Sequence, residues 1–93
     1  MFEYNGAMKW LEVDVISLLD KRHIPMPMRI RFMTKNGARA VDIDKIVSYE
    51  SKIAAGEPYI RYQCRAVNQD DQAVSFMMQY WVSDCLWQMS MTE

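Results

Sequence analysis

Few side chains in this sequence are of types that could perform acid–base, nucleophilic or metal chemistry. His23 is the single histidine, so any general base or metal site would have to include it. It stands beside Lys21 and Arg22, at the end of a predicted helix, where a histidine typically caps the helix or faces solvent. The sequence contains no glycine-rich phosphate loop, no HxxxH pair and no nucleophile elbow. We therefore predict a protein that is not an enzyme, with no catalytic residue and no cofactor.

The two cysteines and the closely spaced acids have structural explanations. Cys64 falls on a predicted core face, where a thiol is unreactive, and Cys85 is expected to be structural as well. Asp42 and Asp44 share one face of a predicted strand, but the turn glycine and distal glutamate of a calcium loop are missing. The acids within 68–71 are typical of a hairpin loop. The sequence therefore predicts no metal site.

The remaining candidates indicate a contact surface rather than an active site. They are aromatic, arginine and methionine side chains of the C-terminal half: Tyr59, Arg61, Arg65, Met77, Trp81 and Trp87. These residue types are enriched in protein–protein interfaces. Large apolar side chains are expected on both faces of strand 73–81, so one face needs cover from the N-terminal segment, a second copy or another protein. We therefore predict a small interaction or accessory module, with a homodimer as one form of that interaction.

Nucleic-acid binding is the alternative function. Tyr59, Arg61, Arg65 and Trp81 share the predicted outward face, and such residues on a sheet can stack bases and contact phosphates. The net charge of −1 argues against this role, because domains that bind phosphate backbones are usually strongly basic. Tyr59 and Trp81 can equally form a cross-strand aromatic pair that stabilises the sheet. Nucleic acid therefore ranks below a protein partner.

Length and composition limit the class of protein. Ninety-three residues favour a single domain, and 51% hydrophobic with 25% charged residues is a globular composition. The start of the sequence has no basic segment followed by an apolar one, and no window is apolar enough to cross a membrane. Two cysteines are too few for a disulfide framework. We therefore expect a cytoplasmic protein with reduced thiols and no membrane partner.

The strongest signal for the fold lies in residues 28–44. Asn36 and Gly37 separate two alternating runs, 28–35 and 38–44, which is typical of a two-residue β-hairpin turn. With Lys35 opposite Ala38, one face is apolar and the other carries two ion pairs. The predicted pairs are Phe32 with Val41, Ile30 with Ile43, Arg31 with Asp42, and Arg29 with Asp44.

A second hairpin is predicted from residues 59–67 and 73–81. With Val67 opposite Ala73, the apolar face pairs Ala66 with Val74, Cys64 with Phe76, Tyr62 with Met78, and Ile60 with Tyr80. The opposite face pairs Arg65 with Ser75, Gln63 with Met77, Arg61 with Gln79, and Tyr59 with Trp81. Loops of three or five residues give the same faces. A four-residue loop would instead place Arg65 and Arg61 with Val74 and Met78, and we favour the first arrangement.

Shorter signals complete the predicted sheet. The polar step at Asp44-Lys45 predicts a bulge that turns a corner, followed by a strand from Ile46 to Ser51. Ser83-Asp84 predicts a tight turn, and Cys85, Trp87, Met89 and Met91 alternate in a last strand with Leu86, Gln88 and Ser90.

The N-terminal segment is ambiguous. Leu11, Val13 and Val15 alternate like a strand, but Val15, Leu18 and Leu19 also fall on one side of a helix. We favour a helix from Val15 to Arg22. The expected fold is mainly β, or α+β if this segment is helical. It is an antiparallel meander forming a twisted sheet or small open barrel (28–91), behind an N-terminal helix or extended cap (1–27).

Overall fold

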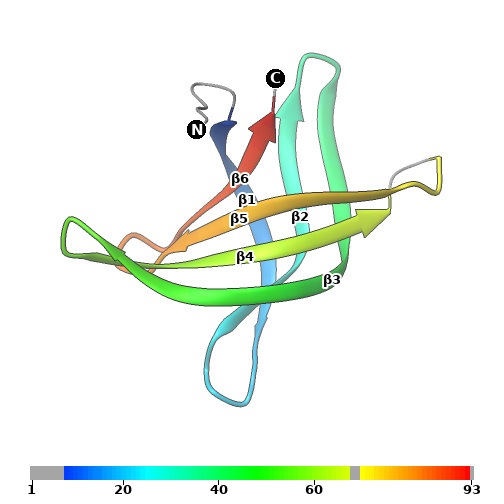
Figure 1. Cartoon of the computed structure of the whole chain (residues 1–93). Coiled ribbons are helices and arrows are strands. Elements are labelled where there is room, and N and C mark those ends of the chain that lie inside the picture. Colours follow the sequence, from blue (N-terminus) through cyan, green and yellow to red (C-terminus); the bar gives the residue numbers. More distant parts are fainter. Residues whose placement is uncertain (1–7, 68–69, 93) are drawn as a thin grey trace, which may run out of the picture.

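Alternating apolar and polar residues produce strands throughout the part of the chain that the computed structural model describes, residues 8–67 and 70–92. Within these ranges there are six strands and no helix, and hence none able to cross a membrane. The strands are β1 (Met8–Leu19), β2 (Pro25–Thr34), β3 (Gly37–Ala54), β4 (Glu57–Val67), β5 (Ala73–Trp81) and β6 (Leu86–Thr92). All neighbours are antiparallel, and β1 also pairs with β6, so the sheet closes into a barrel (Figure 1). The predicted antiparallel meander in a small β-barrel is confirmed.

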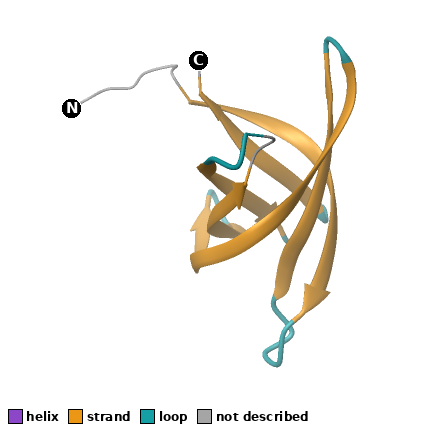
Figure 2. Ribbon diagram, turned by 90° about the vertical axis from the view of Figure 1, so that its right-hand side faces the viewer, coloured by secondary structure: helices purple, strands orange, loops and turns teal. Residues whose placement is uncertain are grey.

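Two strands are shared between the two walls of the barrel. Residues 14–19 of β1 and 37–42 of β3 pair with β2, whereas residues 8–13 and 43–54 of the same strands pair with β6 and β4. The smaller wall thus holds three strands and the larger wall five. Figure 2 shows β2 and its partners facing β4 and β5 across the interior.

The predicted corner at Asp44 is confirmed. The register of β3 against β4 shifts between Ile43 and Lys45, and again between Ile46 and Ser48. A bulge adds a residue to one strand and bends it. The runs that we predicted as two strands, 38–44 and 46–51, therefore form the single strand β3.

The helix predicted from Val15 to Arg22 is wrong, because β1 continues to Leu19 and a turn follows. The strand alternation of Leu11, Val13 and Val15 prevails, since β6 and β2 supply main-chain partners on both sides. The segment is part of the barrel wall rather than a cap. The Asp20 carboxylate closes the turn by accepting backbone N–H groups of Arg22 (2.8 Å) and Ile24 (2.9 Å).

The register predicted for the β2–β3 hairpin is wrong by two residues. Ala38 lies opposite Met33 rather than Lys35, and the turn residues are Lys35 and Asn36. Asn36 lacks the positive φ that a turn centred on Asn36-Gly37 needs, whereas Gly37 has φ 111°. The Thr34 hydroxyl accepts the Asn36 N–H (3.1 Å) and donates to the Gly37 carbonyl (2.9 Å), which stabilises the observed turn.

The shift of two preserves both faces but changes the ion pairs. The Arg31–Asp42 and Arg29–Asp44 pairs that we predicted do not form. The observed pairs are Arg29–Asp42 at 3.0 Å, Arg31–Asp14 at 3.0 Å and Arg65–Asp44 at 3.6 Å. All are exposed, so each contributes only roughly 0.2–1 kcal/mol.

The register predicted for the β4–β5 hairpin is confirmed at every pair from Tyr59–Trp81 to Val67–Ala73. Residues 68–69 of its predicted loop lie outside the described residues. The last strand alternates as expected, although the preceding turn spans residues 82–85.

The core fills the middle of the barrel. Its buried members come from every wall strand except β3: Val13, Ile30, Ile60, Tyr62, Cys64, Met78 and Trp87. Tyr62 is central, because its ring packs 5.5 Å from that of Trp87 and its hydroxyl donates to the Pro25 carbonyl. A buried phenol needs such an acceptor. The same residue thus joins the two walls by packing and by a hydrogen bond.

The two-residue turn between β3 and β4 contains a strained alanine. Ala55 (φ 50°) and Gly56 (φ 79°) both have positive φ, and Ala54 pairs with Glu57 across the turn. Residues with a Cβ atom disfavour this backbone region, but asparagine tolerates it better than alanine does.

We therefore predict that Ala55→Asn stabilises the fold by roughly 0.5–1 kcal/mol, because it relieves this strain. Urea unfolding followed by tryptophan fluorescence measures the change. Ala54→Asn is the matched control: it places the same residue one position earlier, in a strand, where asparagine is disfavoured. Equal effects of the two substitutions would contradict the strain at Ala55.

Candidate functional site

Five of the six residues predicted as an interaction surface lie on the outer face of β4 and β5. Tyr59 lies opposite Trp81, and Arg61, Arg65 and Met77 occupy the same face. The face continues across β6 to Trp10 of β1, which lies opposite Ser90. We call Trp10, Tyr59, Arg61, Met77 and Trp81 the aromatic–arginine face. Sequence reasoning missed Trp10 because it did not place the N-terminal segment in the barrel.

Arg61 is the centre of this face. Its Nη2 donates to Gln79 Oε1 at 2.7 Å, and its guanidinium carbon lies 5.7 Å from the ring centroids of both Trp10 and Tyr59. These distances permit cation–π attraction to both rings. The Nε atom is buried and has no hydrogen-bond partner among the residues that the structure describes. Arg61 is thus held in place by two rings and one amide.

A line of hydrogen bonds continues from Arg61 across the outer surface. Gln79, only 5% exposed, donates through Nε2 to Gln88 Oε1 (3.3 Å), which also accepts the Trp81 indole N–H (2.9 Å). The ring centroids of Trp81 and Tyr59 are 4.5 Å apart. These hydrogen bonds hold the side chains of Arg61, Gln79 and Trp81 in place beside the aromatic rings of the face.

Trp87 does not belong to this surface, and its prediction as an interaction residue is wrong. It is buried in the core, and its ring lies 4.6 Å from that of Tyr80. The predicted alternation of residues 85–91 already indicated that Trp87 is buried, because it places Trp87 on the face opposite Gln88 and Ser90. Trp87 lies opposite Tyr80, whose predicted face is the buried one.

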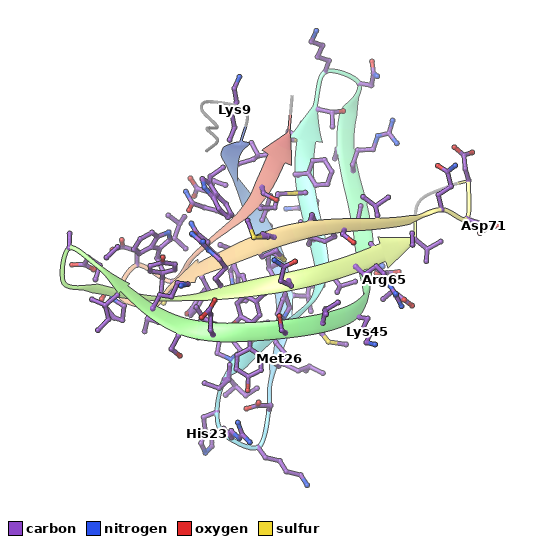
Figure 3. The ribbon with its side chains drawn as sticks, viewed as in Figure 1. Lys9, His23, Met26, Lys45, Arg65 and Asp71 are labelled. Carbon is purple, nitrogen blue, oxygen red and sulfur yellow. The ribbon has the colours of Figure 1, made fainter. Side chains whose placement is uncertain are left out.

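Arg65 lies further along the outer face, beside Lys45 at the far end of β4 (Figure 3). Its pairing with Asp44, and that of Lys52 with Glu50 at 3.6 Å, offset part of the positive charge on β3 and β4. The outer surface of these strands therefore has no large excess of positive charge.

The residues considered for chemistry are dispersed. His23 is exposed in the β1–β2 turn (Figure 3). Asp71 lies in the connection between β4 and β5, away from His23. Within residues 8–67 and 70–92, no three His, Cys, Asp or Glu side chains form a group that could hold a metal ion. Cys64 is buried and Cys85 is exposed, and both are free thiols.

A cavity that the sequence did not predict occupies one mouth of the barrel. Its volume is about 1010 Å³, and it lies between the β2–β3 hairpin and the ends of β4 and β5. Half-buried apolar side chains line it, including Phe32, Val41, Ile43 and Phe76. Pockets of this size in barrel mouths commonly bind small molecules.

An exposed apolar patch is the second feature that sequence reasoning missed. Ile16, Leu18, Leu19 and Met28 lie on β1 and β2 and are between 44% and 65% exposed. The predicted helix would have buried Leu18 and Leu19. In the observed strand they face solvent and form a further area for contact with another chain.

No protein-family model, curated protein or solved structure matches this chain.

The buried titratable groups predict how stability depends on pH. Burial raises the pKa of the Cys64 thiol from 9.0 to about 12, and burial together with the charge of Cys64 raises the pKa of Tyr62. Because folding holds both protons more tightly, their stabilisation is complete below the unfolded pKa values. It is lost as pH rises from about 9 toward the folded pKa values.

We predict that raising the pH from 8 to 10.5 lowers the free energy of unfolding, with about 2 kcal/mol of the loss due to Cys64. Urea titrations at both pH values measure the loss. Cys64→Ala should show a smaller loss than the wild type, whereas Met78→Leu, at a buried side chain that does not titrate, should not. The same pH dependence in all three proteins would contradict the role of the buried thiol.

Proposed function

We propose that this chain is a non-enzymatic binding module that docks on another protein through the aromatic–arginine face. The observation that carries the proposal is the fixed surface in which Trp10, Arg61 and Trp81 are half-buried and pack with the buried Tyr59. Tryptophan, tyrosine and arginine are the residues that most often dominate binding energy in protein interfaces.

Strand pairing along the face supports a surface of side chains as the mode of binding. Residues 59–66 of β4 pair with β3 on one side and with β5 on the other. A partner therefore cannot add a strand beside Tyr59 and Arg61, which is a common way for sheets to bind peptides. Recognition at this face has to use side chains.

The hydrogen bonds within the face favour tight binding. Gln79 holds Arg61, and Gln88 holds Trp81, so these side chains lose little rotamer freedom when a partner binds.

Nucleic-acid binding remains the second candidate, because Arg61, Arg65 and Trp81 share one sheet surface. The charges favour a protein partner instead, because Arg65 is paired with Asp44 and the net charge of the chain is −1. We expect the partner to be cytoplasmic, because Cys64 and Cys85 are unpaired thiols.

We predict that a photo-crosslinking residue in place of Met77 captures one discrete protein in cells of the source organism, and that Trp81→Ala abolishes the product. With that partner purified, Trp81→Ala should weaken binding about 30-fold, the effect expected of a hot-spot tryptophan. Calorimetric titration measures the affinity. The same crosslinker at Ile53, which is 74% exposed at the end of β3, is the matched control.

Three results would contradict the proposal. Capture of the same protein from Met77 and Ile53 would show contact without a preferred face. A product that disappears after nuclease treatment would favour nucleic acid. A product with the mass of two copies would identify the partner as this chain itself, and sedimentation of Leu18→Glu would then test the apolar patch.

A further inference from the structure

The interior of the barrel is filled in the middle and open at one end. The side chains of β5 that face inward run from Tyr80 through Met78 and Phe76 to Val74. Met78 is 0% exposed, whereas Val74 is 42% exposed although it faces the same interior. On β2 the fully buried Ile30 is likewise followed by the half-buried Phe32. The inward-facing side chains of β2 and β5, on opposite walls, therefore both become more exposed toward the same end of the barrel.

The floor of this cavity is apolar and already formed. Ile30 and Ala66 lie at the floor, and both are buried. Phe32, Phe76 and Met89 surround them. Because Ala66 is small, the cavity reaches down to the core without displacing a large side chain. An alkyl chain can enter it and remove apolar surface from water.

Among the described residues that line the cavity, one charged side chain, that of Arg39, lies on the inward face. Arg39 is directly opposite Phe32, so it occupies the inward face of β3, and it lines the cavity. It forms no ion pair with any described residue. The two acids at the rim, Asp42 and Asp44, alternate to the outer face, where Arg29 and Arg65 pair with them. Of the charged residues that line the cavity, Arg39 is therefore the one without an ion-pair partner among the described residues.

We propose that the barrel mouth binds an amphipathic monocarboxylate, such as a medium-chain fatty acid, with its alkyl chain in the cavity and its carboxylate on Arg39. The guanidinium group matches a carboxylate in charge and in the geometry of two parallel hydrogen bonds. Each methylene buried from water raises affinity roughly fourfold. This site is on the inside of the barrel, so it is independent of the aromatic–arginine face and of the protein partner proposed for it.

The test uses sodium decanoate and the full chain. Calorimetric titration measures its affinity for the wild type, and decanol, which has the same chain without the charge, measures the apolar contribution. Arg39→Met removes the cation at an exposed position and should weaken decanoate binding at least tenfold while leaving decanol binding unchanged. Arg39→Lys should restore part of the loss.

Two further variants separate the cavity from general surface binding. Val74→Trp fills the mouth from a side chain that is already 42% exposed, and it should abolish binding of both ligands. Arg22→Met removes an exposed cation from the β1–β2 turn, outside the cavity, and should change neither. Thermal unfolding of each variant establishes that it is folded before binding is measured.

The proposal is overturned if decanoate does not bind the folded wild type at millimolar concentration. It is also overturned if Arg22→Met weakens binding as much as Arg39→Met, which would show attraction to surface charge. If decanoate does not bind but a photo-crosslinker in place of Val74 captures a protein, the mouth holds a partner's side chain rather than a fatty acid.

Discussion

The antiparallel pairing of β1 with β6 joins residues 8–13 to residues 87–92 and gives every described strand two neighbours. This contact between the two ends of the sequence decides which side chains are inside. It places Val13 opposite Trp87, and both are buried in the core with Tyr62. It also brings Trp10 to the outer surface that Arg61 occupies. The core and the proposed binding face therefore depend on the same long-range pairing, which burial and main-chain hydrogen bonds stabilise together.

Local alternation was enough to predict some of the fold. The β4–β5 register follows from the sequence because large apolar side chains alternate in both runs, and a slip of one residue would expose them. In the β2–β3 hairpin the same alternation predicts the faces but not the register, since a shift of two keeps every residue on its side. The side chain of Thr34 and the φ of Gly37 decide that shift. The sequence left residues 7–24 open between helix and strand, because the partners β2 and β6 that make β1 a strand are not evident from this segment alone.

The surfaces were predictable to a similar extent. Tyr59, Arg61, Met77 and Trp81 share a face because side chains alternate along strands, which the sequence displays. The neighbour that completes the face, Trp10, arrives only through barrel closure. The cavity was not predictable, because it results from closure, from the small side chain of Ala66 and from the distance between the walls. No local sequence pattern predicts how these three features combine.

The division of β1 and β3 between the two walls gives the molecule an order of disassembly. Strand β2 pairs only with the halves of β1 and β3 that have left the larger wall, so its release breaks no pairing among β3, β4, β5, β6 and β1 in that wall. Pro25 and Pro27 also contribute no N–H groups to it. The larger wall can therefore persist as a cooperative unit while β2 opens. Such an opening widens the mouth beside Phe32 and admits solvent to Ile30. The release of β2 would therefore both open the interior to ligands and begin the unfolding of the barrel.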